Sequence, residues 1–428
     1  MNTAIDANDR RPNASLDGPE HKPRSLTELG IRQAVLEDIA LKILYLSGPM
    51  STRDLSHHIR LGIEPTNELI SKMRADQFCQ VTGMSGSLPD LAVTSPGRAR
   101  ALELLARNQY AGAAPVSLWN YVVQARRQSV RNVVVHESDV VRAFGHLVIE
   151  SKTLEEVGTA LNSGSSIFLY GPAGVGKTAI AETISRVLSV DDVWIPYAVE
   201  VDGNIIVVFD AMIHKQAVPN KENEDERWVR CHRPSVLVGG ELTGEMFDLQ
   251  LNSSTGFYVG PVQMKANNGV LILDDFGRQR TPPEELLNRW VVPLDRGIDF
   301  LTLAGGKKIE IPFEMLVVFA TNMNPAELVD AAFLRRIQTK IKIAVASDEQ
   351  FCEIFRRLAN ERGLEVDSAL LSELIAEIRG RHHQELRGCQ PRDLINQIVW
   401  AARYKDKQPC LDRASLIKAA ERYFLSES

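Results

Sequence analysis

Cysteine is scarce and scattered in this chain of 428 residues. The five cysteines form no C-x-x-C pair, which argues against a zinc site or a disulfide framework and fits a reducing compartment. Long apolar runs are missing as well, because no stretch is long enough to span a bilayer and the first residues contain no apolar signal core. We therefore expect a cytoplasmic protein with no membrane insertion.

Basic residues are not in excess either. The formal net charge is −6, which argues against a surface coated with non-specific nucleic-acid contacts but leaves room for a local basic face. With 44% hydrophobic and 24% charged residues, the composition is that of an ordinary globular protein. The length predicts two or three domains.

The most specific motif starts at Gly171, where an apolar strand predicted over residues 166–170 runs into the pattern G-x-x-x-x-G-K-T. The residues of this loop and of the start of the helix predicted after it are Gly171, Pro172, Ala173, Gly174, Val175, Gly176, Lys177, Thr178 and Ala179. The pattern is that of the phosphate-binding loop of NTPases. Its glycines let backbone N–H groups converge on one point, and the helix start adds its positive end. Lys177 can reach the β- and γ-phosphates of ATP, and the Thr178 hydroxyl can hold Mg²⁺.

Polar side chains follow two further apolar strands. The strand predicted over residues 270–274 ends in Asp274 and Asp275. Asp274 is predicted to hold Mg²⁺ through water, and Asp275 to orient and polarise the water that attacks the γ-phosphate. The strand predicted over residues 315–320 is followed by Asn322, which can lie between the γ-phosphate and that water.

Three arginines complete the set of candidate residues for the nucleotide site. Arg335 and Arg336 follow a short predicted helix, and Arg392 lies in the first turn of a helix within an all-helical C-terminal segment. The order of the phosphate loop, the carboxylate pair, the polar strand end and these arginines resembles that of the AAA+ ATPases. The resemblance covers residues 151–428.

The resemblance assigns a role to each of these side chains. It implies that Asn322 is sensor 1 and that Arg392 is sensor 2, which reaches the γ-phosphate from a helical lid. It implies that Arg336, with Arg335 as the second candidate, is an arginine finger that enters the site of a neighbouring subunit. Each site would then need two subunits, and a homohexameric ring is the usual closure. The alternative is that Arg335 or Arg336 forms a salt bridge between subunits and that Arg392 is an ordinary surface residue.

Within the AAA+ ATPases, residues 238–290 most resemble the MoxR-type branch. The phrase from Phe257 to Val262 ahead of the carboxylate strand carries this likeness. Residues 249–258 also predict a β-hairpin. The branch places such an insert at the ring pore, where Phe257 and Tyr258 could grip a substrate. The equally open alternative is that both rings pack inside the protein.

Two features depart from the family pattern. Asp275 stands where the family usually has a glutamate, which puts the rate of hydrolysis in question. Asp274 also follows Lys177 by 97 positions, which is long for the family. We assign the excess to residues 195–235, with added strands over 199–210 and a solvated loop over 221–227.

The predicted organisation has five parts. Residues 1–25 are expected to be a disordered tail, and residues 28–109 resemble a winged-helix domain. That domain is predicted from helices at 31–46, at 52–59 and after Pro65, then two short strands at 79–82 and 91–94, and a last helix at 96–107. Residues 110–150 are expected to be a linker with a lead-in helix. Residues 151–345 predict an α/β ATPase core with a largely parallel sheet, strands falling at 166–170, 205–209, 270–274 and 315–320, and residues 346–428 predict a helical lid.

Three classes of function fit these predictions. The leading hypothesis is a ring-forming ATPase that couples ATP hydrolysis to the remodelling or assembly of a protein partner, with the winged helix as adaptor. The second is a nucleic-acid-acting ATPase or transcriptional regulator, which the acidic character of the would-be recognition helix disfavours, since Glu64, Glu68 and Asp76 outnumber its two cations. The third is an ATP-dependent assembly switch with slow hydrolysis, which Asp275 keeps open.

Overall fold

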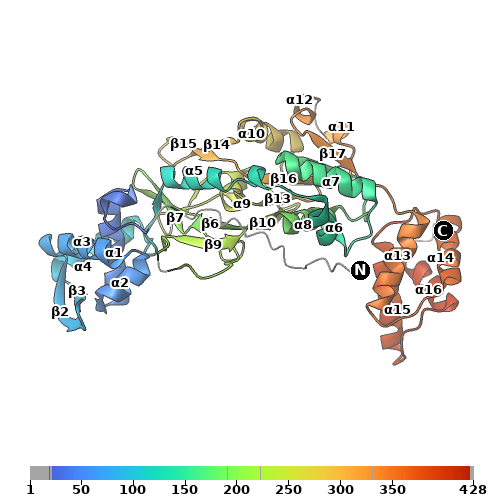
Figure 1. Cartoon of the computed structure of the whole chain (residues 1–428), viewed down its shortest axis with the longest axis horizontal. Coiled ribbons are helices and arrows are strands. Elements are labelled where there is room, and N and C mark those ends of the chain that lie inside the picture. Colours follow the sequence, from blue (N-terminus) through green and yellow to red (C-terminus); the bar gives the residue numbers. More distant parts are fainter. Residues whose placement is uncertain (1–18, 20–21, 190, 222, 329–330, 425–428) are drawn as a thin grey trace, which may run out of the picture.

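The computed structural model describes residues 19, 22–189, 191–221, 223–328 and 331–424. Figure 1 shows an elongated chain with three bodies along its long axis: an N-terminal body, a central α/β body and a C-terminal helical body. Most of the tail predicted over residues 1–25 lies outside the described residues. Among the described helices, none has both the length and the apolar character needed to cross a bilayer.

The N-terminal body contains the helices and the β-ribbon that the sequence predicts. Its elements are η1 (Thr27–Leu29), α1 (Gln33–Ser47), β1 (Met50–Ser51), α2 (Thr52–Ile59), α3 (Ile63–Ala75), β2 (Cys79–Ser85), β3 (Leu88–Val93) and α4 (Ser95–Arg107). The three strands form an antiparallel sheet in the order β1-β3-β2. Ser51 caps α2 because its hydroxyl accepts a hydrogen bond from Asp54 N at 3.2 Å. The winged-helix assignment of this body stays a prediction.

The segment over 110–150, expected to be a linker with a lead-in helix, contains helices and packs into the central body. It forms β4 (Val116–Ser117), α5 (Leu118–Arg127), η2 (Val130–Asn132) and α6 (Glu137–Phe144). Tyr121 and Gln128 are buried there. Asn267 donates a hydrogen bond to the Tyr121 hydroxyl at 2.7 Å, and Gln128 donates one to Asn268 Oδ1 at 2.8 Å. These buried polar contacts show that the segment is part of the packed interior.

A parallel five-stranded sheet forms the centre of the molecule, as the predicted P-loop α/β fold requires. Its order is β10 (Ser235–Val238), β13 (Val270–Leu273), β16 (Leu316–Thr321), β5 (Ile167–Tyr170) and β17 (Thr339–Lys342). Each pair of neighbours is parallel. The phosphate-loop strand β5 therefore lies beside β16, and the carboxylate strand β13 lies one strand further. The carboxyl ends of all three strands meet at one edge of the sheet.

Helices cover both faces of this sheet because its strands alternate buried side chains between two cores. Leu169, Ile272 and Val318 share one core with α6, α7 (Ser151–Ser163) and α8 (Lys177–Leu188). Phe168 and Phe319 share the other core with α10 (Pro283–Arg296), where their rings stack at 5.6 Å. Strands buried on both faces are expected of a parallel sheet.

A second sheet accounts for part of the long insertion. Its order is β11 (Gln250–Leu251), β12 (Tyr258–Val259), β8 (Asn204–Val207), β7 (Ala198–Val201) and β4. The strand expected over 205–209 is thus present but belongs here, because it pairs with β7 in a tight hairpin rather than with the parallel sheet. The added strands expected over 199–210 are confirmed.

Two antiparallel ribbons and several short helices complete the central body. The ribbons join β6 (Asp192–Pro196) to β9 (Trp228–His232), and β14 (Ile298–Thr302) to β15 (Lys308–Pro312). The short helices are η3 (Gly244–Phe247), α9 (Val262–Ala266), α11 (Pro325–Leu328) and α12 (Ala331–Leu334). The solvated loop expected over 221–227 is wrong at its end, where Asp225 and Arg227 are buried and form an ion pair at 2.7 Å.

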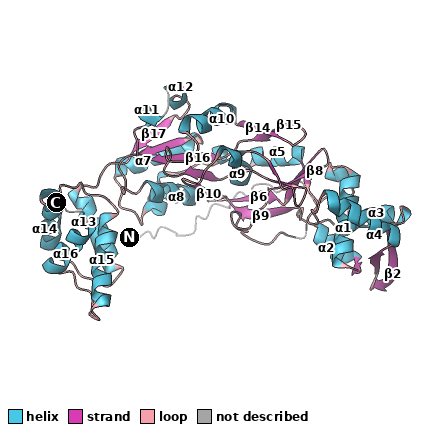
Figure 2. Cartoon of the chain, turned by 180° about the vertical axis from the view of Figure 1, so that it is seen from behind, coloured by secondary structure: helices cyan, strands magenta, loops and turns pink. Residues whose placement is uncertain are grey.

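The C-terminal body contains only helices among the described residues, as Figure 2 shows. They are α13 (Asp348–Asn360), α14 (Ser368–Gly380), α15 (Gln390–Tyr404) and α16 (Arg413–Tyr423). Their apolar side chains share one core, which includes Phe351, Leu371 and Leu394. The segment predicted from 346 onwards is helical, as the sequence indicates.

Candidate functional site

The phosphate loop connects β5 to α8 in a backbone conformation that needs glycine. Gly171, Gly174 and Gly176 all have positive φ, at 150°, 79° and 98°. A Cβ atom at Gly171 would lie 2.1 Å from the carbonyl oxygen of Ile343, and one at Gly174 would lie 2.5 Å from Cys389 Sγ. The loop is therefore held tightly between the sheet and the helical body.

Lys177 is the buried cation of this loop and is only 7% exposed. Its Nζ donates to the carbonyl oxygens of Gly171 at 2.9 Å and Pro172 at 2.8 Å, and to Asn322 Oδ1 at 2.5 Å. Burial lowers the pKa of the ammonium group, and the nearby charges of Asp274 and Asp275 oppose that shift. The ammonium group is thus held at the bottom of a cavity by acceptors that come from two neighbouring strand ends.

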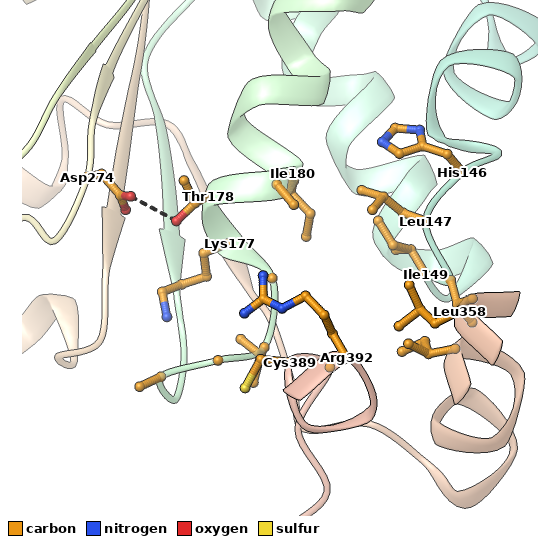
Figure 3. A pocket seen from close by; sticks show the side chains of 18 of the residues that line it. His146, Leu147, Ile149, Lys177, Thr178, Ile180, Asp274, Leu358, Cys389 and Arg392 are labelled. Carbon is orange, nitrogen blue, oxygen red and sulfur yellow. Dashed lines mark hydrogen bonds between the residues drawn. The ribbon is translucent and has the colours of Figure 1, made fainter. Parts of the chain in front are cut away.

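Thr178 and Asp274 lie side by side, as the sequence predicts. The Thr178 hydroxyl donates to Asp274 Oδ2 at 2.8 Å, as Figure 3 shows. A hydroxyl and a carboxylate are hard oxygen ligands of the kind Mg²⁺ takes when substrate phosphate and water supply its other ligands. Within the described part of the chain, no group of three or more His, Cys, Asp or Glu side chains is placed to hold a metal ion. The donor set fits a cation shared with a phosphate.

Asp275 and Asn322 are joined by a hydrogen bond. Asn322 Nδ2 donates to Asp275 Oδ1 at 3.1 Å, while its Oδ1 accepts from Lys177. Asp275 has a φ of 47°, a left-handed conformation that Asp and Asn adopt more readily than most residues. The carboxylate at the end of β13 and the ammonium group of the phosphate loop are therefore linked through the end of β16.

Arg392 reaches the same cavity from the helical body. It lies in the first turn of α15, and Figure 3 shows its guanidinium extending toward the phosphate loop. Its Nε donates to Asp393 Oδ1 at 3.0 Å. The backbone also links the two bodies here, because Cys389 N donates to the carbonyl oxygen of Gly174 at 3.0 Å. A movement of the helical body would therefore shift the phosphate loop through this hydrogen bond.

The cavity continues into an apolar half that no sequence motif indicates. Its total volume is about 640 Å³, and the phosphate loop, Asp274, Asp275, Asn322 and Arg392 line its polar half. The apolar half is lined by His146, Leu147, Val148, Ile149, Ile354 and Leu358. These residues come from the end of the supposed linker and from α13. The only signal that could have found them is the short apolar run at 147–149 just ahead of α7.

Arg335 and Arg336 do not line this cavity. Arg335 is exposed, and Arg336 Nε donates to Asp295 Oδ2 of α10 at 2.9 Å. Both follow α12, which Figure 1 shows beside α11 at the upper edge of the central body, away from the phosphate loop at the start of α8. Of the predicted site residues, these two alone are not brought to the phosphate loop within one chain.

The ring of Tyr258 packs inside the protein, as the second of the two sequence alternatives has it, and the ring of Phe257 is half-buried. Tyr258 is buried, and its hydroxyl accepts a hydrogen bond from Ala304 N at 2.8 Å. The Phe257 ring meets that of Tyr110 edge to face at 5.7 Å, next to the N-terminal core. The predicted hairpin is present as β11 and β12. Its role is to dock the N-terminal body rather than to present free aromatic rings.

Comparison with protein families finds one match. Residues 347–422, which form most of the helical body, match a family described as a domain of unknown function (DUF8689). No curated protein sequence matches the chain.

Several solved structures resemble the fold at low identity. The RuvB Holliday junction branch migration motor of Thermotoga maritima has a TM-score of 0.37 and 15% identity, over 64% of this chain and 69% of that chain. A RuvB mutant from Thermotoga maritima has a TM-score of 0.36 and 15% identity, over 69% of this chain and 72% of that one. NtrX from Brucella abortus, in complex with ADP, has a TM-score of 0.40 and 14% identity, over 65% of this chain and 56% of that one.

Proposed function

We propose that this chain is an AAA+ ATPase that binds Mg·ATP between its α/β body and its helical body and hydrolyses it. The observation that carries this proposal is the hydrogen-bonded unit of Lys177, Asn322 and Asp275, with the Thr178–Asp274 pair beside it. Phosphoryl transfer requires a cation on the phosphates, ligands for Mg²⁺ and a group that orients water. The cavity supplies all three within one sheet edge.

Each side chain has a role in this proposal. The loop N–H groups and Lys177 bind the phosphates, and the Thr178 hydroxyl and Asp274 hold Mg²⁺, which neutralises phosphate charge when it is bound. Asp275 accepts a hydrogen bond from the attacking water, and Asn322 holds Asp275 in place. Arg392 stabilises the γ-phosphate from the helical body. The apolar residues Leu147, Ile149 and Leu358 cover the nucleotide base and exclude water from it.

The catalytic arginine is proposed to come from a second copy of the chain. Arg336 does not line its own cavity, and its side chain is partly exposed while paired with Asp295, so we propose that it reaches a neighbour's γ-phosphate. In such a contact, the surface around Arg336 of one subunit meets the cavity of the next. This head-to-tail arrangement forms a ring when the rotation between subunits closes. We propose a homohexamer of this kind, with the pair Arg336–Asp295 holding the arginine in position.

The work of hydrolysis is proposed to be remodelling or assembly of a protein partner, in the manner of the MoxR-type branch. The N-terminal body supports a protein partner over DNA. A DNA-reading helix presents the residues of its N-terminal turns to the bases. In this chain α3 exposes Glu64 and Glu68 there, and Glu68 already accepts a hydrogen bond from Leu26 N at 3.0 Å. Lys22, four residues before Leu26, forms an ion pair with Glu226 at 2.5 Å.

One experiment tests the activity itself. Phosphate release from ATP is measured for the purified full-length chain with Mg²⁺ and with a chelator. Steady turnover that depends on Mg²⁺ supports an ATPase. Tight ATP binding with no release above the rate of buffer alone would instead favour the assembly switch, and no binding at all would contradict the proposal.

A further inference from the structure

The edge of the parallel sheet carries an open strand beside an apolar groove. β10 is the last strand of the sheet and pairs only with β13 among the described strands. Val270 N and Asp274 N donate to the carbonyl oxygens of Pro234 and Val238, so these alternate residues face β13. In a parallel strand the residues between them face the other way. The backbone N–H and C=O groups of Ser235 and Leu237 therefore point to the unpaired side of the sheet.

Apolar side chains gather next to this edge. A groove of about 440 Å³ is lined by all of β10 and by Met212, Ile213, Met246, Val259 and Val262. Met212 is 83% exposed, Leu237 is 49% exposed and Val259 is 38% exposed. Exposed apolar side chains that come together from three segments mark an interaction surface rather than scattered surface residues.

The charges on the groove favour a basic partner. Glu241, which follows the end of β10, and Asp248 both line it and are exposed. Glu241 accepts a hydrogen bond from Gly239 N at 3.0 Å. The lining cation, Lys265, is already paired with Asp210 at 2.8 Å. Asp248 lies 3.8 Å from the guanidinium of Arg289. Glu241 is therefore the lining carboxylate that carries the charge argument for a basic partner.

We propose that this edge binds an extended segment of a partner protein, with apolar side chains in alternate positions and lysine or arginine at its ends. The segment adds a strand to β10 by pairing with the backbone of Ser235 and Leu237. Its apolar side chains fill the groove against Leu237 and Val259, where the methionines adapt to their shape. A cation at one of its ends meets Glu241. This binding surface is separate from the ATP site and does not require nucleotide.

The test uses three fluorescent synthetic peptides and the full-length chain without nucleotide. One peptide alternates valine with serine and has lysine and arginine at both ends. The second carries glutamate at the ends instead, and the third is the basic peptide with N-methyl groups on the amides that would pair. We expect saturable binding of the basic peptide by fluorescence anisotropy. The acidic and N-methylated peptides should bind about tenfold more weakly or worse.

Matched variants locate the site. Leu237→Lys and Glu241→Lys should each weaken binding of the basic peptide about tenfold. Leu102→Lys, at a leucine that is 52% exposed on α4, and Glu137→Lys on α6 should leave binding unchanged. Lys177→Ala should also leave it unchanged, which separates this surface from the ATPase. Equal binding of all three peptides, no binding, or binding that Leu237→Lys does not alter would overturn the proposal. So would a loss of self-association in Leu237→Lys, since the occupant would then be a second copy of the chain.

Discussion

Asn322 joins Lys177 to Asp275 through its two amide atoms. Its Oδ1 accepts a hydrogen bond from Lys177 Nζ at 2.5 Å, and its Nδ2 donates to Asp275 Oδ1 at 3.1 Å. The three residues follow three different strands of one parallel sheet. A change at any of them is therefore expected to affect the other two, although their roles in binding and hydrolysis differ.

Lys177→Ala should remove most of the affinity for ATP. A hydrogen bond to a charged group is worth about 1.5–3 kcal/mol, so the dissociation constant should rise at least about tenfold. Isothermal calorimetry with Mg·ATP measures this loss. Lys152→Ala, at an exposed lysine of α7, is the control and should bind ATP normally. Unchanged affinity in Lys177→Ala would contradict the assignment of the phosphate loop.

Asp275→Asn should bind Mg·ATP but hydrolyse it slowly. The amide cannot accept the water's proton as a carboxylate does, and a general base contributes about 10²–10⁴-fold in rate. Asparagine tolerates the positive φ of 47° at this position, so the backbone should not be strained. Single-turnover phosphate release is the measurement. Full activity in Asp275→Asn would place the base elsewhere.

Asp275→Glu has two opposing effects. The longer side chain restores the reach that the AAA+ family usually has, which should raise turnover. Glutamate is less suited to a left-handed backbone, which costs about 1–2 kcal/mol. We expect turnover to rise and the melting temperature to fall. If turnover and the melting temperature both rose, or both fell, the effects of side-chain reach and of backbone strain would not be independent.

The sequence predicted the polar half of the site because its residues follow local rules. A glycine-rich loop before a helix and carboxylates after apolar strands are contiguous patterns, and parallel strands bring such ends together. It did not predict the apolar half, because Ile149 and Leu358 meet only through packing of two distant segments. β10 and β17 are the edge strands of the sheet and alternate or mix exposed with buried residues, so neither shows the continuous apolar run that reveals β5 and β13. Some buried polar residues have hydrogen-bond partners far along the chain. Gln128 donates to the carbonyl oxygen of Trp194, and Arg227 donates to that of Pro115. Local sequence patterns do not reveal such pairs.

Lys42 should make stability depend on pH in the N-terminal body. It is buried, its Nζ donates to Asn108 O at 3.0 Å, and burial lowers its pKa from 10.5 to about 8. Below about pH 8 both folded and unfolded chains carry the charge, so folding bears the full penalty of burying it. Between about pH 8 and pH 10.5 the unfolded chain binds more protons, so stability rises as pH increases.

Lys42→Met removes that penalty. The variant should be more stable than the unchanged protein at about pH 7, by up to about 3 kcal/mol, and the difference should shrink at about pH 10. Calorimetric melting of both proteins at the two pH values measures it. Lys405→Met, at an exposed lysine, should show no such trend. A difference that stays constant with pH would contradict the lowered pKa.

Duplex DNA should bind the full-length chain only weakly and without sequence preference. The reason is the acidic start of α3 and the segment at 22–26 that contacts it. Fluorescence anisotropy against salt concentration checks this, since non-specific contacts weaken steeply with salt. Tight, sequence-selective binding at physiological salt, lost in Lys72→Glu, would favour the nucleic-acid-acting class instead.

The most direct test of the shared active site is the ATPase rate of mixed variants. Arg336→Ala should bind ATP nearly normally but lose turnover, since a comparable arginine is worth about 10³–10⁵-fold in GTPases. Asp295→Ala removes the partner that positions Arg336 but keeps the guanidinium, so it should lower turnover less than Arg336→Ala does. Lys177→Ala loses binding in its own site but still offers Arg336 to a neighbour. After subunit exchange has been verified, a mixture of Arg336→Ala and Lys177→Ala should recover part of the activity that each lacks alone. A mixture that stays inactive at every ratio, or a monomer that hydrolyses ATP at full rate, would contradict an active site built from two subunits.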